Sequence, residues 1–152
     1  MQRSDAMRTA LLACWMLVLI GPVNTAHAAD PANPLITDHG LFRPLVIVSP
    51  QRDDDDYQRM RTQLRASHAK FEARDMVLYR VENGQGYRND EPMTRFETQA
   101  LLKALTLDDD ASLTTVLVGK DGGKKMQLEG FVAPETVYHI IDQMPMRAAE
   151  RD

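Results

Sequence analysis

The sequence predicts an α/β fold: one domain with the element order β-α-β-α-β-β-α and a central four-stranded mixed sheet, which follows a cleaved signal peptide. Three observations carry this prediction. Short runs of β-branched and apolar residues alternate with segments in which apolar residues recur at helical spacing. A glycine-rich turn separates the last two apolar runs. Near the amino terminus, a short apolar stretch ends in small residues.

The amino-terminal segment has the organisation of a secretory signal peptide. Arg3 and Arg8 are basic, residues 11–20 are an uninterrupted apolar run, and Ala26 and Ala28 supply the small residues that precede a cleavage site. A membrane-spanning helix needs about 20 apolar residues, which is roughly twice the length of this run. Cleavage after Ala28 is therefore preferred over retention as a membrane helix, and we expect an exported protein, periplasmic or extracellular, with no stable membrane insertion.

Cleavage would remove the only cysteine, Cys14, and the only tryptophan, Trp15. The remaining chain has the length of one domain, and its stability would come from core burial, because no disulfide can form. Of the 18 basic and 22 acidic residues, Arg3, Arg8 and Asp5 fall in the segment removed, which leaves 16 and 21 and a net charge near −5. This charge argues against nucleic acid and anionic membrane surfaces as partners.

The first half of the domain predicts a β-α-β unit. Residues 29–43 hold prolines and a glycine without periodicity, so we expect an extended arm. Residues 45–48 are a β-branched run bounded by prolines, typical of a strand buried on both faces. An amphipathic helix follows over about residues 54–74, and residues 76–81 form the second strand. Strands joined by a helix of this length should be parallel, with a right-handed crossover.

A second helix is predicted after a polar connection. Residues 82–92 are polar and contain glycine, so we expect a loop. Thr94 and Glu97 have the spacing of a capping box, and apolar residues then recur at helical spacing as far as Leu105. This segment therefore predicts a helix that returns the chain to the sheet.

The last part of the domain predicts a hairpin and a closing helix. Residues 113–118 and 125–128 are strand-like runs joined by a glycine-rich turn, which indicates an antiparallel pair. Pro134 suits the first position of the last helix, and Pro145 stops it. Residues 148–152 are expected to be a polar tail.

This order of elements is the thioredoxin-like arrangement, in which two parallel strands joined by a helix precede an antiparallel hairpin and a closing helix. We therefore expect residues 44–147 to form a thioredoxin-like domain, with sheet order 2-1-3-4 and helices on both faces. A small flavodoxin-like fragment is the alternative, and it would need a further parallel strand where the hairpin lies.

Four segments of the chain resemble the domain of unknown function 4174 family. They are residues 43–50, which open the domain, residues 72–78, which lead into the second strand, residues 118–123 at the hairpin turn, and residues 141–147 at the close. The resemblance spans about residues 41–147. It implies a thioredoxin- or peroxiredoxin-like fold, with similar domains in bacterial exported proteins and in animal extracellular matrix and sushi-repeat proteins. The family has no established catalytic residues, so the resemblance assigns none here.

Thiol chemistry is disfavoured at the position where such a fold performs it. A thioredoxin-like domain uses a thiolate between its first strand and the following helix, whose amino terminus lowers the thiol pKa. In this chain the junction consists of Ser49, Pro50, Gln51, Arg52 and Asp53, with no sulfur. A serine hydroxyl cannot replace a thiolate in disulfide exchange or peroxide reduction. Thiol-disulfide oxidoreductase and peroxidase activities are therefore not expected.

The same junction is the candidate contact surface, because ligands of α/β sheets settle outside the carboxyl ends of the parallel strands. This places Ser49, Pro50, Gln51 and Arg52 at the surface that would meet a ligand or partner, with residues 83–87 nearby. The leading hypothesis is a redox-inactive binding or interaction module whose partner is an unknown envelope or extracellular protein, with no cofactor and no catalytic residue assigned. The alternative is a non-thiol enzyme in the same cleft, either a hydrolase using Ser49 or a metal-dependent enzyme.

No metal site is predicted. Residues 53–56 are four consecutive aspartates, and carboxylate oxygens suit calcium. Consecutive residues at a helix start point in different directions, however, so helix capping and interaction with the helix dipole are the preferred interpretation. His39, His68 and His139 each lack a second histidine at metal-ligand spacing. His68 borders the apolar face of its helix, so we expect it to be partly buried.

Overall fold

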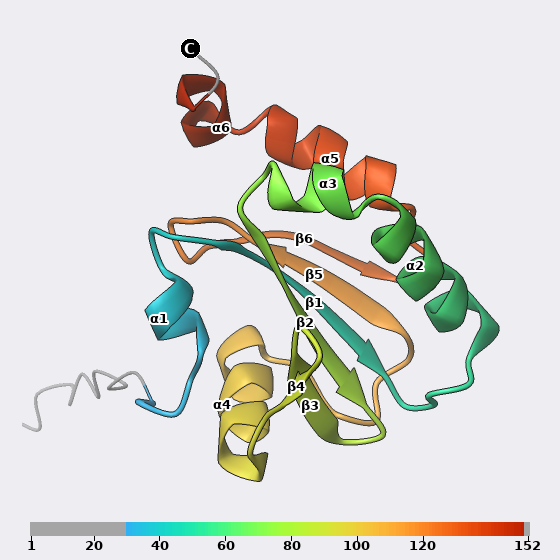
Figure 1. Ribbon diagram of the computed structural model, residues 1–152. Helices are drawn as coiled ribbons and strands as arrows, with labels where there is room; N and C mark the ends of the chain where they lie inside the picture. The colour runs from blue at the N-terminus through green and yellow to red at the C-terminus, as the bar shows by residue number, and fades with distance from the viewer. Residues whose placement is uncertain (1–29, 151–152) are drawn as a thin grey trace, which may run out of the picture.

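Residues 30–150 are described by the computed structural model, in which a six-stranded mixed sheet lies between helices on both of its faces (Figure 1). The strands are β1 (Arg43–Ser49), β2 (Met76–Glu82), β3 (Gln85–Arg88), β4 (Glu91–Pro92), β5 (Thr114–Val118) and β6 (Lys124–Glu129). The helices are α1 (Leu35–Asp38), α2 (Asp55–Ala66), α3 (His68–Glu72), α4 (Arg95–Leu105), α5 (Pro134–Asp142) and α6 (Pro145–Ala149). One core lies between the sheet and α2, α3 and α5, and a second lies between the sheet and α4. The predicted signal peptide, residues 1–28, lies outside the described residues.

The four predicted strands are neighbours in the sheet, in the predicted order β2-β1-β5-β6, with β6 at one edge. β1 pairs in parallel with β2 and antiparallel with β5, and β5 pairs antiparallel with β6. All residues of β1 are buried, because this central strand has a layer of helices on each face. The antiparallel β5–β6 hairpin excludes the flavodoxin-like alternative, which requires a parallel strand at that position.

The prediction of four strands was wrong, because β3 and β4 extend the sheet beyond β2. They lie in residues 82–92, which were expected to be a loop. Asn83 and Gly84 have positive φ angles of 50° and 77°, which is the conformation of a type I′ hairpin turn. The Asn-Gly pair in the sequence is a signal for a hairpin turn. The residues around it are mostly polar and include Gly86, so they lack the alternation of apolar residues that normally indicates the flanking strands.

The long helix predicted over residues 54–74 is interrupted. It forms α2 and α3, separated at Ser67, whose φ of −106° and ψ of 22° are not helical. The Ser67 hydroxyl bonds to the backbone of α2 and lies 2.7 Å from the hydroxyl of Tyr138 on α5, and serine favours helix ends because it competes for backbone groups in this way. At the start of α2, the Asp54 carboxylate accepts a hydrogen bond from the backbone N–H of Tyr57 at 2.8 Å. The capping role predicted for the aspartate run is therefore confirmed at Asp54.

The segment predicted as an extended arm, residues 29–43, is described from residue 30, and this part is anchored to the sheet. It contains α1, a helix of one turn, which is too short to produce a periodic pattern in the sequence. Asp38, only 1% exposed, accepts hydrogen bonds from the Tyr79 hydroxyl at 2.6 Å and from Arg88 at 2.8 Å. Arg43 belongs to β1 and not to the arm.

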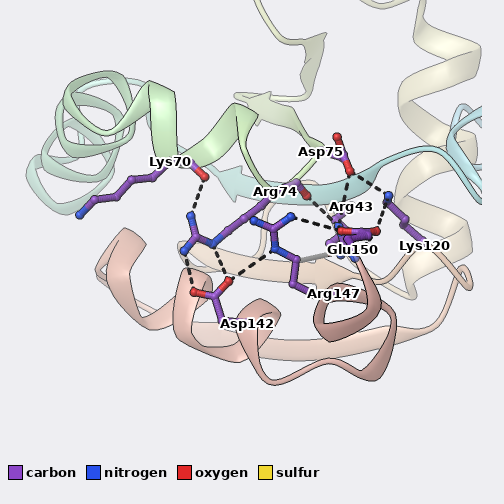
Figure 2. Close-up of polar contacts among 8 residues, drawn as sticks. All are labelled: Arg43, Lys70, Arg74, Asp75, Lys120, Asp142, Arg147 and Glu150. Carbon is purple, nitrogen blue, oxygen red and sulfur yellow. Dashed lines mark hydrogen bonds and ion pairs between the residues drawn. The ribbon is translucent and has the colours of Figure 1, made fainter. Parts of the chain in front are cut away.

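The carboxyl-terminal segment is anchored as well, although residues 148–152 were expected to be a polar tail (Figure 2). Glu150 follows α6 and lies 3.0 Å from the guanidinium of Arg43, which is 1% exposed. Lys120 reaches Glu150 at 2.7 Å and Asp75 at 2.8 Å. These four residues form a charge cluster that joins α6 to the start of β1 and to the end of the hairpin strand β5, so the described part of the predicted tail, residues 148–150, is part of the folded unit.

Gly86 allows β3 to approach α4 closely. A Cβ atom added at this glycine would lie far inside contact distance of the Thr98 hydroxyl and 3.1 Å from the Thr98 Cβ. Thr98 is buried on α4, so it has no open space to move into. We expect Gly86→Ala to lower the free energy of unfolding by about 1–2 kcal/mol through overpacking, measured by urea denaturation.

The test of this contact is a double variant. Thr98→Ala removes the hydroxyl that the new Cβ would meet, so the loss in Gly86→Ala/Thr98→Ala should be smaller than the sum of the two single losses. Losses that simply add would show that the cost of Gly86→Ala arises elsewhere in β3.

Candidate functional site at the carboxyl ends of the parallel strands

Of the four predicted contact residues, Ser49 is the last residue of β1 and the other three lie in the loop between β1 and α2, and they are not equally accessible. Gln51 and Arg52 are exposed and Pro50 is half-buried. Ser49 is fully buried, and its hydroxyl donates a hydrogen bond to the backbone carbonyl of Gln51 at 2.6 Å. The structure therefore leaves Pro50, Gln51 and Arg52 available for contact and removes Ser49 from the surface.

A buried glutamate at the end of the neighbouring strand organises this region. Glu82 is the last residue of β2, pairs in register with Ser49, and is 3% exposed. Its carboxylate accepts hydrogen bonds from the Tyr57 hydroxyl and from Arg80, and lies 2.9 Å from Nε of Arg52. We call this set, together with Arg61 of α2 at 3.8 Å from the same carboxylate, the Glu82 cluster.

In the Glu82 cluster, the carboxylate stays ionised and the Tyr57 hydroxyl stays protonated near neutral pH. Burial alone would raise the pKa of Glu82, but the Tyr57 hydroxyl and the guanidinium groups of Arg80, Arg61 and Arg52 outweigh burial and hold that pKa below its ordinary value. Burial and the adjacent Glu82 carboxylate raise the pKa of Tyr57, which keeps its hydroxyl protonated as a donor. A glutamate with a lowered pKa and a tyrosine with a raised one do not exchange protons near neutral pH. The arrangement suits binding and rigidity more than acid–base catalysis.

Arg52 is exposed yet held in position. Its guanidinium lies against Glu82 and donates a hydrogen bond to the Tyr87 hydroxyl of β3 at 3.0 Å. Arg80 lies 5.0 Å from the centre of the Tyr87 ring, within the range of a cation–π contact. β3, which the sequence did not reveal, therefore supplies the aromatic side chain that fixes the one exposed arginine of the loop.

Glu82 was missed because its environment is assembled from separate segments. In the sequence it is a charged residue at the end of an apolar run, which indicates a strand terminus. Only the pairing of β1 with β2 and the packing of α2 bring Arg52 and Arg61 to it. The one local signal is that Arg80 and Glu82 are two residues apart in a strand and share a face.

The described residues, 30–150, contain no group of three or more histidine, cysteine or acidic side chains arranged to hold a metal ion. His68 is exposed, with its ring 3.3 Å from Glu72, so the expectation of partial burial was wrong. The apolar face of α2 ends before this residue, because the helix is interrupted at Ser67. Among residues 30–150, no helix has the length and apolar character needed to cross a bilayer.

Comparison with known proteins places the chain in a family and gives no activity. The family model described as "Domain of unknown function (DUF4174)" matches residues 35–150. This chain belongs to that family. No curated protein and no solved structure matches it significantly.

Proposed function

We propose that this member of the DUF4174 family is a redox-inactive binding module on a thioredoxin-like scaffold. The strand order β2-β1-β5-β6, with one parallel pair and α2 between its two strands, supports such a scaffold, to which β3 and β4 are an addition. We further propose that the protein acts after export, with residues 1–28 as its cleaved signal, and that its partner is a protein of the envelope or extracellular space.

The observation that carries the proposal is the environment of Ser49. This residue occupies the position where thiol chemistry would need a cysteine, and its hydroxyl is buried and donates to the backbone carbonyl of Gln51 in the following loop. A nucleophile must reach its substrate and lie within hydrogen-bond distance of a base, and neither condition is met here. A hydrolase that uses Ser49 therefore has no support in the geometry.

Two observations favour a contact surface at Pro50, Gln51 and Arg52. Gln51 and Arg52 are exposed, and the Arg52 side chain is held in place by its neighbours. Arg52 is fixed by Glu82 and Tyr87 before any partner arrives, and preorganised side chains lose less conformational freedom on binding. Arginine is also enriched among the residues that dominate protein interfaces.

Photo-crosslinking in the source cells tests this proposal. A photoreactive residue at Gln51 should give one discrete adduct with another protein, whereas the same residue at Lys103, exposed on α4, should not. Adding Arg52→Ala to the Gln51 variant should abolish the adduct without unfolding the domain, because exposed ion pairs contribute only about 0–1 kcal/mol. Equal labelling from both positions would contradict the contact surface, and a chain that stays in the cytoplasm with residues 1–28 attached would contradict export.

A further inference from the structure

A groove lies beside the Glu82 cluster, on the face of the sheet that α2 and α3 cover. It has a volume of about 330 Å³ and lies between these helices, β2 and the turn that joins β3 to β4. One side of the groove is formed by Asn89 and Asp90 in the turn after β3. Register places Arg80 of β2 opposite Tyr87 of β3, so β3 continues the sheet beside the strand that carries the floor of the groove.

The groove has an apolar floor. Leu64 of α2, Phe71 of α3, and Met76 and Leu78 of β2 line it. Met76 and Leu78 alternate with residues that face α4, so they lie on one face of β2 together with Arg80. Leu78 is only half-buried, although its neighbours in the floor belong to the core. An apolar ligand group placed here would remove that surface from water.

The edge of the groove next to the Glu82 cluster is positively charged. Three guanidinium groups, those of Arg61, Arg65 and Arg80, line the groove together with two carboxylates, those of Glu72 and Asp90. Both carboxylates have partners already: Glu72 faces His68, and Asp90 lies 3.0 Å from Arg80. One positive charge is therefore in excess among the side chains that line the groove.

The excess falls on Arg61 and Arg65, which are neighbours on one face of α2 because they are four residues apart. The carboxylate nearest to Arg61 is Glu82, at 3.8 Å, and it is shared with Arg52 and Arg80. The Arg65 guanidinium has no hydrogen bond or ion pair with any residue in the described part of the chain, 30–150. Two guanidinium groups at this spacing repel one another, and an anion between them would relieve the repulsion.

We propose that this groove binds a small amphiphilic carboxylate, with its carboxylate at Arg61 and Arg65 and its apolar part on Leu64, Phe71 and Leu78. The arginine fork matches carboxylate geometry, and the single excess charge favours a monoanion over a dianionic phosphate. The volume is at the lower end of the range for small-molecule sites, which suits a medium-length alkyl chain or one aromatic ring. This inference concerns a small molecule in the groove and does not depend on the protein partner proposed for Pro50, Gln51 and Arg52.

Titration of the ¹⁵N-labelled protein with octanoate, followed by NMR, tests the proposal. We expect saturable shifts of the amides around Arg61, Arg65 and Phe71, with a dissociation constant of roughly 0.1–1 mM for a ligand of this size. Octanol, which has the chain without the charge, and acetate, which has the charge without the chain, should each bind at least about fivefold more weakly. Octyl phosphate carries the same chain with a dianionic phosphate in place of the carboxylate, and it should bind no more tightly than octanoate.

Arg65→Gln is the decisive variant, because this exposed side chain makes no hydrogen bond or ion pair with any of residues 30–150. It should weaken octanoate binding about fivefold, whereas Lys103→Gln, which removes the same charge from α4, should leave binding unchanged. Equal binding of octanol and octanoate, an unaffected Arg65→Gln variant, tighter binding of octyl phosphate, or no saturable shift would each overturn the proposal. None of these outcomes alters the crosslinking expected from Gln51, so this inference and the proposed function can fail independently.

Discussion

Glu82→Ala is expected to lower the free energy of unfolding by about 3–5 kcal/mol, the loss typical of removing one partner from a buried charge pair. The wild-type carboxylate is 3% exposed and is surrounded by Arg52, Arg61 and Arg80. Without it, Arg80 remains 6% exposed with Asp90 as its nearest acidic partner, and the Tyr57 hydroxyl loses its acceptor. Urea denaturation at pH 7, followed by circular dichroism, measures this loss.

Two further variants separate the buried charge from an ordinary surface charge. Glu91→Ala removes an exposed glutamate from β4 and should change the free energy of unfolding by no more than about 0.5 kcal/mol. Arg52→Ala removes the exposed partner of Glu82, which keeps Arg61, Arg80 and the Tyr57 hydroxyl, and should cost about 0–1 kcal/mol. If Glu82→Ala is no more destabilising than Glu91→Ala, then Glu82 does not organise the end of the sheet.

The elements that the sequence predicted correctly are those whose pattern lies within a short stretch of the chain. β1, β2, β5 and β6 were predicted, and so were the capping roles of Thr94 and Asp54, because each produces a pattern within a few neighbouring residues. β3 and β4 were missed because strands of four and two residues, rich in polar side chains, give almost no alternation.

The position of the candidate site could be predicted from the sequence, but the burial and contacts of its residues could not. The rule that ligands settle at the carboxyl ends of parallel strands led to the loop after β1, and Gln51 and Arg52 are exposed there. Ser49 is buried because β1, which ends at this residue, is buried over its whole length; the sequence placed it at the junction and not in the strand. One side of the groove could not be predicted, because Asn89 and Asp90, which line it, lie in the turn between the two missed strands.

The charge cluster of Arg43, Asp75, Lys120 and Glu150 has a further consequence at low pH (Figure 2). Hydrogen bonds from Arg43 lower the pKa of Glu150 from its ordinary value of 4.5 to about 2, with help from Lys120 and Arg147 and against the opposing effect of burial. A carboxylate whose pKa is lower in the folded state contributes stability above its unfolded pKa, and this contribution is lost as pH falls through the folded value. The contribution of Glu150 is therefore complete near neutral pH and disappears between about pH 4.5 and pH 2.

Glu150→Gln should lower the free energy of unfolding by about 2–3 kcal/mol at pH 7, because Arg43 is left buried with only the more distant Asp75 as an acidic partner. The difference between the two proteins should shrink steadily below pH 4.5 and be small near pH 2, where about half of the wild-type carboxyl is protonated. Urea denaturation at pH 7, 4 and 2.5 measures both curves, and Glu129→Gln, an exposed change on β6, serves as the matched control. Curves that remain parallel from pH 7 to pH 2.5 would mean that Glu150 contributes through the shape of its side chain. Convergence would instead show that a charge at the end of the chain holds α6 against the first strand.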